Sequence, residues 1–131
     1  MNIGSVSRKT GVSSKTIRYY ESVDLIPSAA RAPNGYRVYD EVDVQTLRFI
    51  QRARGLGFSV AEVANLLDLW HDKNRTSAEV KSFTLKRIEQ VERKIGELET
   101  IRAVLSELAE RCQGDERPEC PILEQLARDV A

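Results

Sequence analysis

Apolar residues at the beginning of the chain recur every three or four positions, which predicts two short helices. Residues 3–12 suit a helix that Gly11 closes, and residues 13–21 begin a second helix with a serine at its N-cap. Two short helices across a glycine-containing turn form a helix-turn-helix. On its own this pattern is common among small helical proteins.

The segment after the second helix has the pattern of a hairpin. Two prolines break helix there, and Asn34-Gly35 is the dipeptide preferred by tight hairpin turns. A small β-wing is therefore expected, with basic and aromatic side chains that can reach a phosphate backbone. The side chains concerned are Arg31, Tyr36 and Arg37.

Two more helices are predicted before residue 72. The first begins at the acidic run that starts with Asp40, and glycines at 55 and 57 end it. Ser59 and Glu62 are three residues apart and predict a capping box for the second, which continues to Trp70. We expect Phe58 and Trp70 to fill the core between this helix pair and the helix that follows.

Residues 77–110 contain no proline and one glycine, and their apolar residues are spaced by three and four. Positions 88, 91, 95 and 98 alternate like a coiled-coil seam. Such a helix spans about 50 Å at about 1.5 Å per residue and cannot bury its own apolar stripe. A second copy of the chain is the simplest partner, so we expect a homodimer. A helix folded back on its own domain is the alternative.

The chain has two cysteines, Cys112 and Cys120, on either side of a short loop. Pro121 suits the first turn of a short amphipathic helix, which places Cys120 near its N-cap. A structural disulfide is disfavoured in a reducing cytosol, so metal binding or thiol redox chemistry is expected. Two thiols and one histidine disfavour a zinc or iron–sulfur site within one chain.

The charges are unevenly distributed although the net charge is zero. Residues 1–56 hold nine basic and five acidic residues, whereas residues 57–131 hold eleven and fifteen. This asymmetry suits a basic end that binds nucleic acid and an acidic partner or sensor end. No signal peptide or membrane span is predicted, so we expect a cytoplasmic protein without membrane contact. We find no phosphate-binding glycine loop and no nucleophile–base pair, which argues against an enzyme.

Four motifs occur in one order along the chain: IRYYE (17–21), LIP (25–27), NGYRVY (34–39) and RGLGFS (54–59). Together with the long helix they resemble the MerR family over essentially the whole chain. The resemblance implies a mainly α fold. It comprises a winged helix-turn-helix DNA-binding domain (1–75), a long antiparallel coiled-coil dimerisation helix (76–110), and a metal-binding loop with a short helix (111–131). It also implies a homodimer that distorts double-stranded promoter DNA for RNA polymerase when an effector binds.

Candidate DNA-binding side chains come from the second helix and from the wing. The second helix would enter a major groove, and the wing would contact phosphates. Tyr20 is expected in the domain core and is left out of this set. The candidates are Lys15, Arg18, Tyr19, Arg31, Tyr36 and Arg37.

The two-cysteine loop resembles that of the copper-efflux branch of the family. Cu(I), Ag(I) and Au(I) are soft ions that prefer thiolates and accept two of them in a line. We therefore predict one of these ions as the effector, bound by Cys112 and Cys120. The start of the helix at Pro121 would offset part of the remaining negative charge and lower the pKa of Cys120.

Metal selectivity is assigned to Ser77. Family members that sense divalent zinc, lead or mercury resemble this chain but have a third cysteine at that position. The missing thiolate favours ions of charge +1. A structural alternative, which does not exclude the first, is that Ser77 is the N-cap of the long helix.

A thiol redox switch, in which the two cysteines form a disulfide, is the main alternative function. A multidrug sensor is disfavoured because those relatives carry a large C-terminal ligand-binding domain, whereas this sequence ends soon after Cys120.

Overall fold

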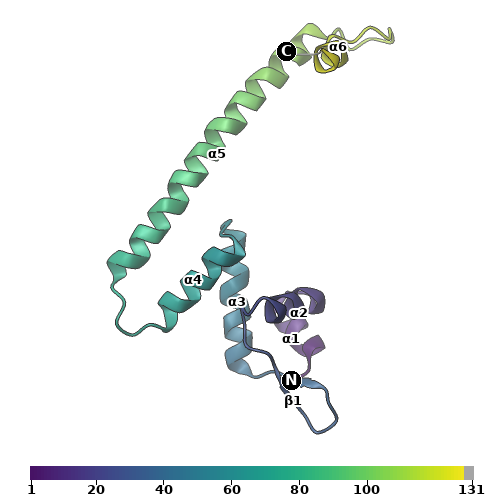
Figure 1. Cartoon of the computed structure of the whole chain (residues 1–131). Coiled ribbons are helices and arrows are strands. Elements are labelled where there is room, and N and C mark those ends of the chain that lie inside the picture. Colours follow the sequence, from purple (N-terminus) through teal and green to yellow (C-terminus); the bar gives the residue numbers. More distant parts are fainter. Residues whose placement is uncertain (129–131) are drawn as a thin grey trace. The chain divides into compact units, whose positions relative to one another are not determined.

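The computed structural model describes residues 1–128 and is mainly helical, with one small hairpin (Figure 1). The chain divides into two units, residues 1–80 and 81–131, which are described separately below. The predicted mainly α fold, with a winged helix-turn-helix and a long helix, is confirmed. The elements are α1 (Ile3–Thr10), α2 (Ser14–Ser22), β1 (Ala30–Arg31), β2 (Arg37–Val38), α3 (Glu41–Gly55), α4 (Val60–His71), α5 (Ser77–Arg111) and α6 (Pro121–Ala127).

The helix-turn-helix forms where the local sequence predicts it. Gly11 ends α1 with a left-handed backbone, at φ 75°, where a side chain would be strained. The Ser13 hydroxyl then accepts the Thr16 N–H at 3.1 Å and caps α2. The turn between the two helices is therefore determined by residues within it.

The wing is a two-stranded antiparallel hairpin with Ala30 opposite Val38 and Arg31 opposite Arg37. Its turn contains Gly35 at φ 83°, and the Asn34 side chain accepts the Tyr36 N–H at 3.1 Å. The predicted Asn-Gly hairpin is confirmed.

Capping boxes begin both α3 and α4. Asp40 and Asp43 exchange hydrogen bonds at the start of α3, and Ser59 and Glu62 do so at the start of α4, as predicted for the second pair. Between the helices, Arg54 donates to the Phe58 carbonyl at 2.7 Å and closes the turn.

The core of the N-terminal unit contains apolar side chains from each of the helices α1 to α4. Tyr20 and Phe58 are also buried, as expected. Trp70 is not: it is 42% exposed, although its ring stacks on Phe49 at 4.5 Å and on His71 at 5.3 Å. The side chains without exposure are Val6, Ile17, Val44, Leu47, Ile50 and Val63.

The long helix α5 is continuous over 35 residues. The predicted seam is solvent-exposed in the single chain, from 38% at Val91 to 51% at Leu98. This row of half-exposed aliphatic side chains is an apolar surface that the single chain leaves uncovered. No helix among the described residues is long and apolar enough to cross a membrane.

Candidate DNA interface and metal-binding loop

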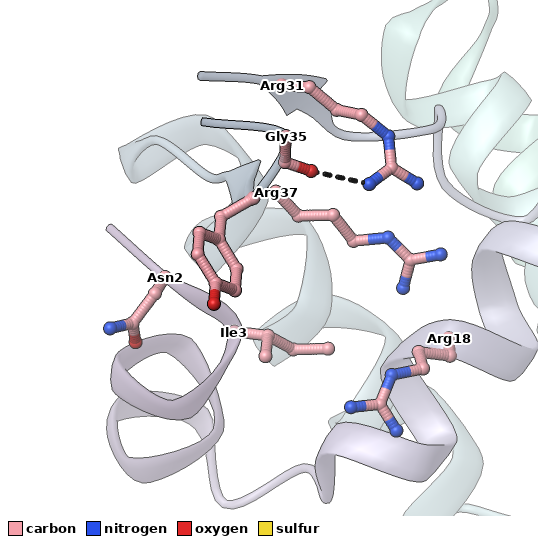
Figure 2. A pocket seen from close by; sticks show the side chains of 7 residues that line it. Asn2, Ile3, Arg18, Arg31, Gly35 and Arg37 are labelled. Atoms are coloured by element: carbon pink, nitrogen blue, oxygen red, sulfur yellow. Dashed lines mark hydrogen bonds between the residues drawn. The ribbon is translucent and has the colours of Figure 1, made fainter. Parts of the chain in front are cut away.

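Three arginines from three different elements line one pocket of about 310 Å³ in the N-terminal unit (Figure 2). Arg18 comes from α2, Arg31 from β1 and Arg37 from β2. Every charged side chain that lines the pocket is an arginine. The remaining lining residues are Asn2, Ile3, Gly35 and Tyr36.

The hairpin itself orients one of these arginines. Arg31 Nη1 donates to the Gly35 carbonyl at 2.8 Å, which holds the side chain along the wing. Figure 2 shows the Arg37 guanidinium between those of Arg31 and Arg18. Planar guanidinium groups that converge in this way match the oxygens of a phosphate.

Four of the six predicted DNA-binding residues meet at this pocket: Arg18, Arg31, Tyr36 and Arg37. Tyr36 stands at the wing tip and is 72% exposed. Lys15 and Tyr19 do not line the pocket, but both are exposed on α2. They are therefore available to a groove without belonging to the arginine cluster.

Sequence reasoning missed a buried polar cluster beside the pocket. Glu21 is 7% exposed, and its carboxylate accepts the Tyr39 hydroxyl at 2.5 Å and lies 3.5 Å from Arg37 Nε. Burial, reinforced by the hydrogen bond to Glu21, raises the pKa of Tyr39 to about 12. One signal was available: Glu21 lies four residues after Ile17 and hence on the buried face of α2.

The two cysteines lie at the ends of the loop between α5 and α6, and both are free and half-buried. The Leu123 N–H, followed by that of Ile122, lowers the pKa of Cys120, and the Cys112 thiol adds to this effect. The loop therefore brings together the two thiols that the sequence predicts, with one of them biased toward the thiolate.

The first turn of α5 corrects one interpretation of Ser77. The Thr76 hydroxyl accepts the Glu79 N–H at 3.2 Å, and the Glu79 carboxylate accepts the Thr76 N–H at 3.4 Å. This reciprocal pair is a capping box. The N-cap is therefore Thr76, and the interpretation of Ser77 as the cap is wrong. Ser77 is an exposed residue of the first turn, and its role in metal selectivity stays a prediction.

Two family models match the chain. The one described as MerR HTH family regulatory protein matches residues 1–70, and the one described as MerR, DNA binding matches residues 44–108.

Named transcription regulators match over nearly the whole chain. It is 50% identical over 131 residues to heavy metal-dependent transcription regulator 2 of Rhizobium meliloti, a match that covers 100% of this chain and 89% of that one. It is 42% identical over 127 residues to the HTH-type transcriptional regulator CueR of Salmonella typhimurium, covering 97% and 92%. The solved structure of the transcription regulator PbrR691 from Ralstonia metallidurans in complex with lead(II) matches with a TM-score of 0.81. That match has 35% identity and covers 97% and 99% of the two chains.

Proposed function

Because the chain belongs to the MerR family of transcription regulators, we propose that it is a promoter-binding activator that senses Cu(I), or Ag(I) or Au(I), through Cys112 and Cys120. Proteins of this family are regulators that bind promoter DNA and are not enzymes. The observation that carries the proposal is the pair of free thiols in one loop, with the pKa of Cys120 lowered.

DNA binding is assigned to α2 and the wing. In this assignment α2 presents Lys15, Arg18 and Tyr19 to a major groove, and the arginine pocket receives a backbone phosphate. Support comes from the convergence of Arg18, Arg31 and Arg37 without an acidic residue in the pocket lining. Phosphate contacts of this kind set the position of the protein on DNA, and base contacts from α2 set its sequence preference.

The active form is proposed to be a homodimer. The seam on α5 supplies the apolar surface that a second copy would cover, through an antiparallel coiled coil. Burying such aliphatic side chains contributes about 25 cal/mol per Å² of apolar area removed from water.

Charge explains why the loop suits a monovalent ion. Two thiolates around a +1 ion retain one negative charge, which is costly to bury unless it is offset. The N–H groups at the start of α6 favour negative charge at Cys120 and lower its pKa. Zinc usually takes four ligands, and two thiolates leave it under-coordinated. A serine at position 77 supports the same selectivity for +1 ions, because its hydroxyl group does not supply a third thiolate.

Activation is assigned to a change in the bound promoter. On metal binding the dimer is proposed to distort the promoter so that RNA polymerase can start transcription of metal-efflux or detoxification genes. The metal acts here as an effector that shifts the protein between two DNA-bound states, so it must bind those states with different affinities.

Transcription in vitro from the promoter complex tests this function. Cu(I), Ag(I), Zn(II) and no metal are compared in excess reductant, with the Cys112→Ser protein as the control. We expect induction by Cu(I) and Ag(I) only, and none in the control. Induction by zinc alone, or equal induction of the control, would overturn the assignment.

A thiol redox switch is the second candidate, and the contact between the two thiols favours it. An oxidant would remove two electrons and two protons from Cys112 and Cys120 to form a disulfide. Such a switch would respond to oxidant and ignore Cu(I) under reducing conditions, so the same experiment distinguishes it.

A further inference from the structure

A buried carboxylate lies on the helix that we assign to the major groove. The Glu21 side chain is 6% exposed, on a helix whose neighbouring residues Lys15, Arg18 and Tyr19 are exposed. Burying a charge is costly unless it is paired and hydrogen-bonded. The partners of Glu21 therefore determine what it contributes.

Both partners come from the end of the wing. The Tyr39 hydroxyl donates to Oε1 at 2.5 Å, and Arg37 Nε lies 3.5 Å from Oε2, so each oxygen has its own partner. Arg37 and Tyr39 follow Glu21 by 16 and 18 positions in the chain, so these contacts are not part of a local turn. Glu21 thus connects α2 to the wing.

Tyr39 fixes the base of the wing on its other side as well. Its N–H donates to the Met1 carbonyl at 2.7 Å, and its carbonyl accepts from the Met1 ammonium at 2.8 Å. Tyr39 is 3% exposed. The wing is therefore held at its base by backbone bonds and by the carboxylate of Glu21.

Arg37 links Glu21 to the arginine pocket. Its inner nitrogen Nε faces Glu21, while the side chain remains 30% exposed and lines the arginine pocket (Figure 2). The ion pair restricts a flexible side chain to the orientation in which its guanidinium lies between Arg31 and Arg18. Ordering such a side chain before binding removes an entropic cost from the binding step.

We propose that Glu21 is a positioning residue for DNA binding, which holds Arg37 and the wing in the orientation that grips a phosphate. The inference rests on the proposed contact of the wing with DNA. Glu21 itself contacts no phosphate and acts through Arg37.

Two effects of Glu21 on DNA affinity have opposite signs, and this makes the proposal testable. A negative charge beside a phosphate site repels DNA, so its removal by itself would strengthen binding. A carboxylate that positions Arg37 strengthens binding, so its removal weakens it. Whether removing the Glu21 charge weakens or strengthens DNA binding therefore shows which of the two effects is larger.

The primary variant is Glu21→Gln in the full-length protein, with operator affinity measured by fluorescence anisotropy at several salt concentrations. Glutamine keeps the shape and an acceptor for Tyr39 but loses the ion pair with Arg37. We expect about three- to tenfold weaker binding, the loss that corresponds to one side chain ordered on binding. The matched control is Glu41→Gln. Glu41 is a well-exposed glutamate of the same unit, 3.5 Å from Lys9, and its variant should bind DNA no more weakly than the wild type.

A double-mutant cycle shows whether the effect passes through Arg37. If it does, Glu21→Gln changes affinity little in an Arg37→Ala background. Stronger binding by the single variant, or an equal loss in both backgrounds, would overturn the proposal. Unchanged affinity of Arg37→Ala alone would instead refute the proposed wing contact, so the two failures are distinguishable.

A second variant covers the case in which Glu21→Gln does not fold, as judged by circular dichroism and thermal unfolding. Glu21→Asp keeps the charge but shortens the side chain by one methylene, so it tests geometry at constant charge. We expect weaker DNA binding from this variant also. Wild-type affinity in a folded Glu21→Asp protein would overturn the positioning role.

Discussion

The Tyr39 hydroxyl donates a 2.5 Å hydrogen bond to Oε1 of the buried Glu21, and this contact joins the end of the wing to α2. Neither residue is exposed, so the bond lies in a medium where it is stronger than in water and where leaving either group unpaired is costly. The orientation of the wing therefore depends on a buried polar contact as well as on apolar packing.

The first prediction concerns the titration of Tyr39. Its pKa is about 12 in the folded protein and 10.0 when free, so between these values the unfolded chain loses a proton that the folded chain keeps. Stability should therefore fall as the pH rises from 10.0 to about 12, by roughly 2–3 kcal/mol from this group. Tyrosinate absorbance, measured during a pH titration, should show one late step near pH 12.

Tyr39→Phe is the control for that titration. The variant should lack the late step and lose less stability over the same pH range. A late step that persists in Tyr39→Phe would assign the raised pKa to another of the four tyrosines.

The second prediction concerns the arginine pocket. Arg18→Ala and Arg37→Ala should each weaken operator binding by roughly 1–3 kcal/mol, since each removes a charge-assisted contact to a phosphate or base. Losing a phosphate contact should also reduce the slope of log binding constant against log salt concentration by about one. Arg117→Ala is the control, because Arg117 is exposed in the loop after α5 and pairs with Asp115 at 2.7 Å. Unchanged affinity and salt slope in both pocket variants would contradict the assignment.

The third prediction concerns dimerisation through α5. Asp at both Ile95 and Leu98 places two charges on the seam and should yield monomers or aggregates in sedimentation. Lys94 and Glu97 form an exposed ion pair at 3.5 Å on the same helix. Exchanging that pair (Lys94→Glu with Glu97→Lys) should leave the dimer intact. A stable dimer of the seam variant would show that the partner lies on another surface.

The fourth prediction concerns the two thiols. Cys112→Ser and Cys120→Ser should each abolish induction by Cu(I) while operator affinity stays within about twofold of the wild type. The loop belongs to residues 81–131, whereas the proposed DNA-binding residues belong to residues 1–80. Anisotropy and transcription assays on the same preparations separate the two effects. Full induction in either variant would exclude a site that needs both thiolates.

The fifth prediction concerns metal selectivity at Ser77. Ser77 and the cysteine loop lie at opposite ends of α5, so in the proposed antiparallel dimer Ser77→Cys would offer a third thiolate from the partner subunit. Three thiolates would leave a +2 ion at a net charge of −1, the value that the native pair reaches with a +1 ion. Ser77→Cys should therefore gain a measurable, incomplete transcriptional response to Zn(II). The cap of α5 is made by Thr76 and Glu79, so this substitution should not cost the helix its cap.

Thr76→Ala is the matched control. It removes the cap, should destabilise the protein by about 1 kcal/mol, and should gain no response to zinc. Ser77→Cys without added zinc affinity, and with Cu(I) induction unchanged, would show that residue 77 does not take part in metal selectivity.

Features that depend on residues three or four apart were predictable from the sequence. The glycine end of α1, the Ser13 cap of α2, the Asn34-Gly35 hairpin and the Ser59–Glu62 box all formed as expected. Each is decided within one turn of chain, where backbone sterics and a single hydrogen bond select the conformation. The exception is the start of α5, where two adjacent hydroxyl residues compete for one cap. Thr76 is the residue that has a glutamate three positions later.

The sequence by itself determined the elements, the candidate residues on each, and the apolar stripe of α5. Only the tertiary structure decided which candidates meet. It brought Arg18 to Arg31 and Arg37, left Lys15 and Tyr19 outside that pocket, kept Trp70 half open on Phe49, and buried Glu21 against Tyr39. The physical reason is that these contacts join residues far apart in the chain. Such partners are chosen by how helices and hairpin pack together, and a periodicity in the sequence carries no information about that choice.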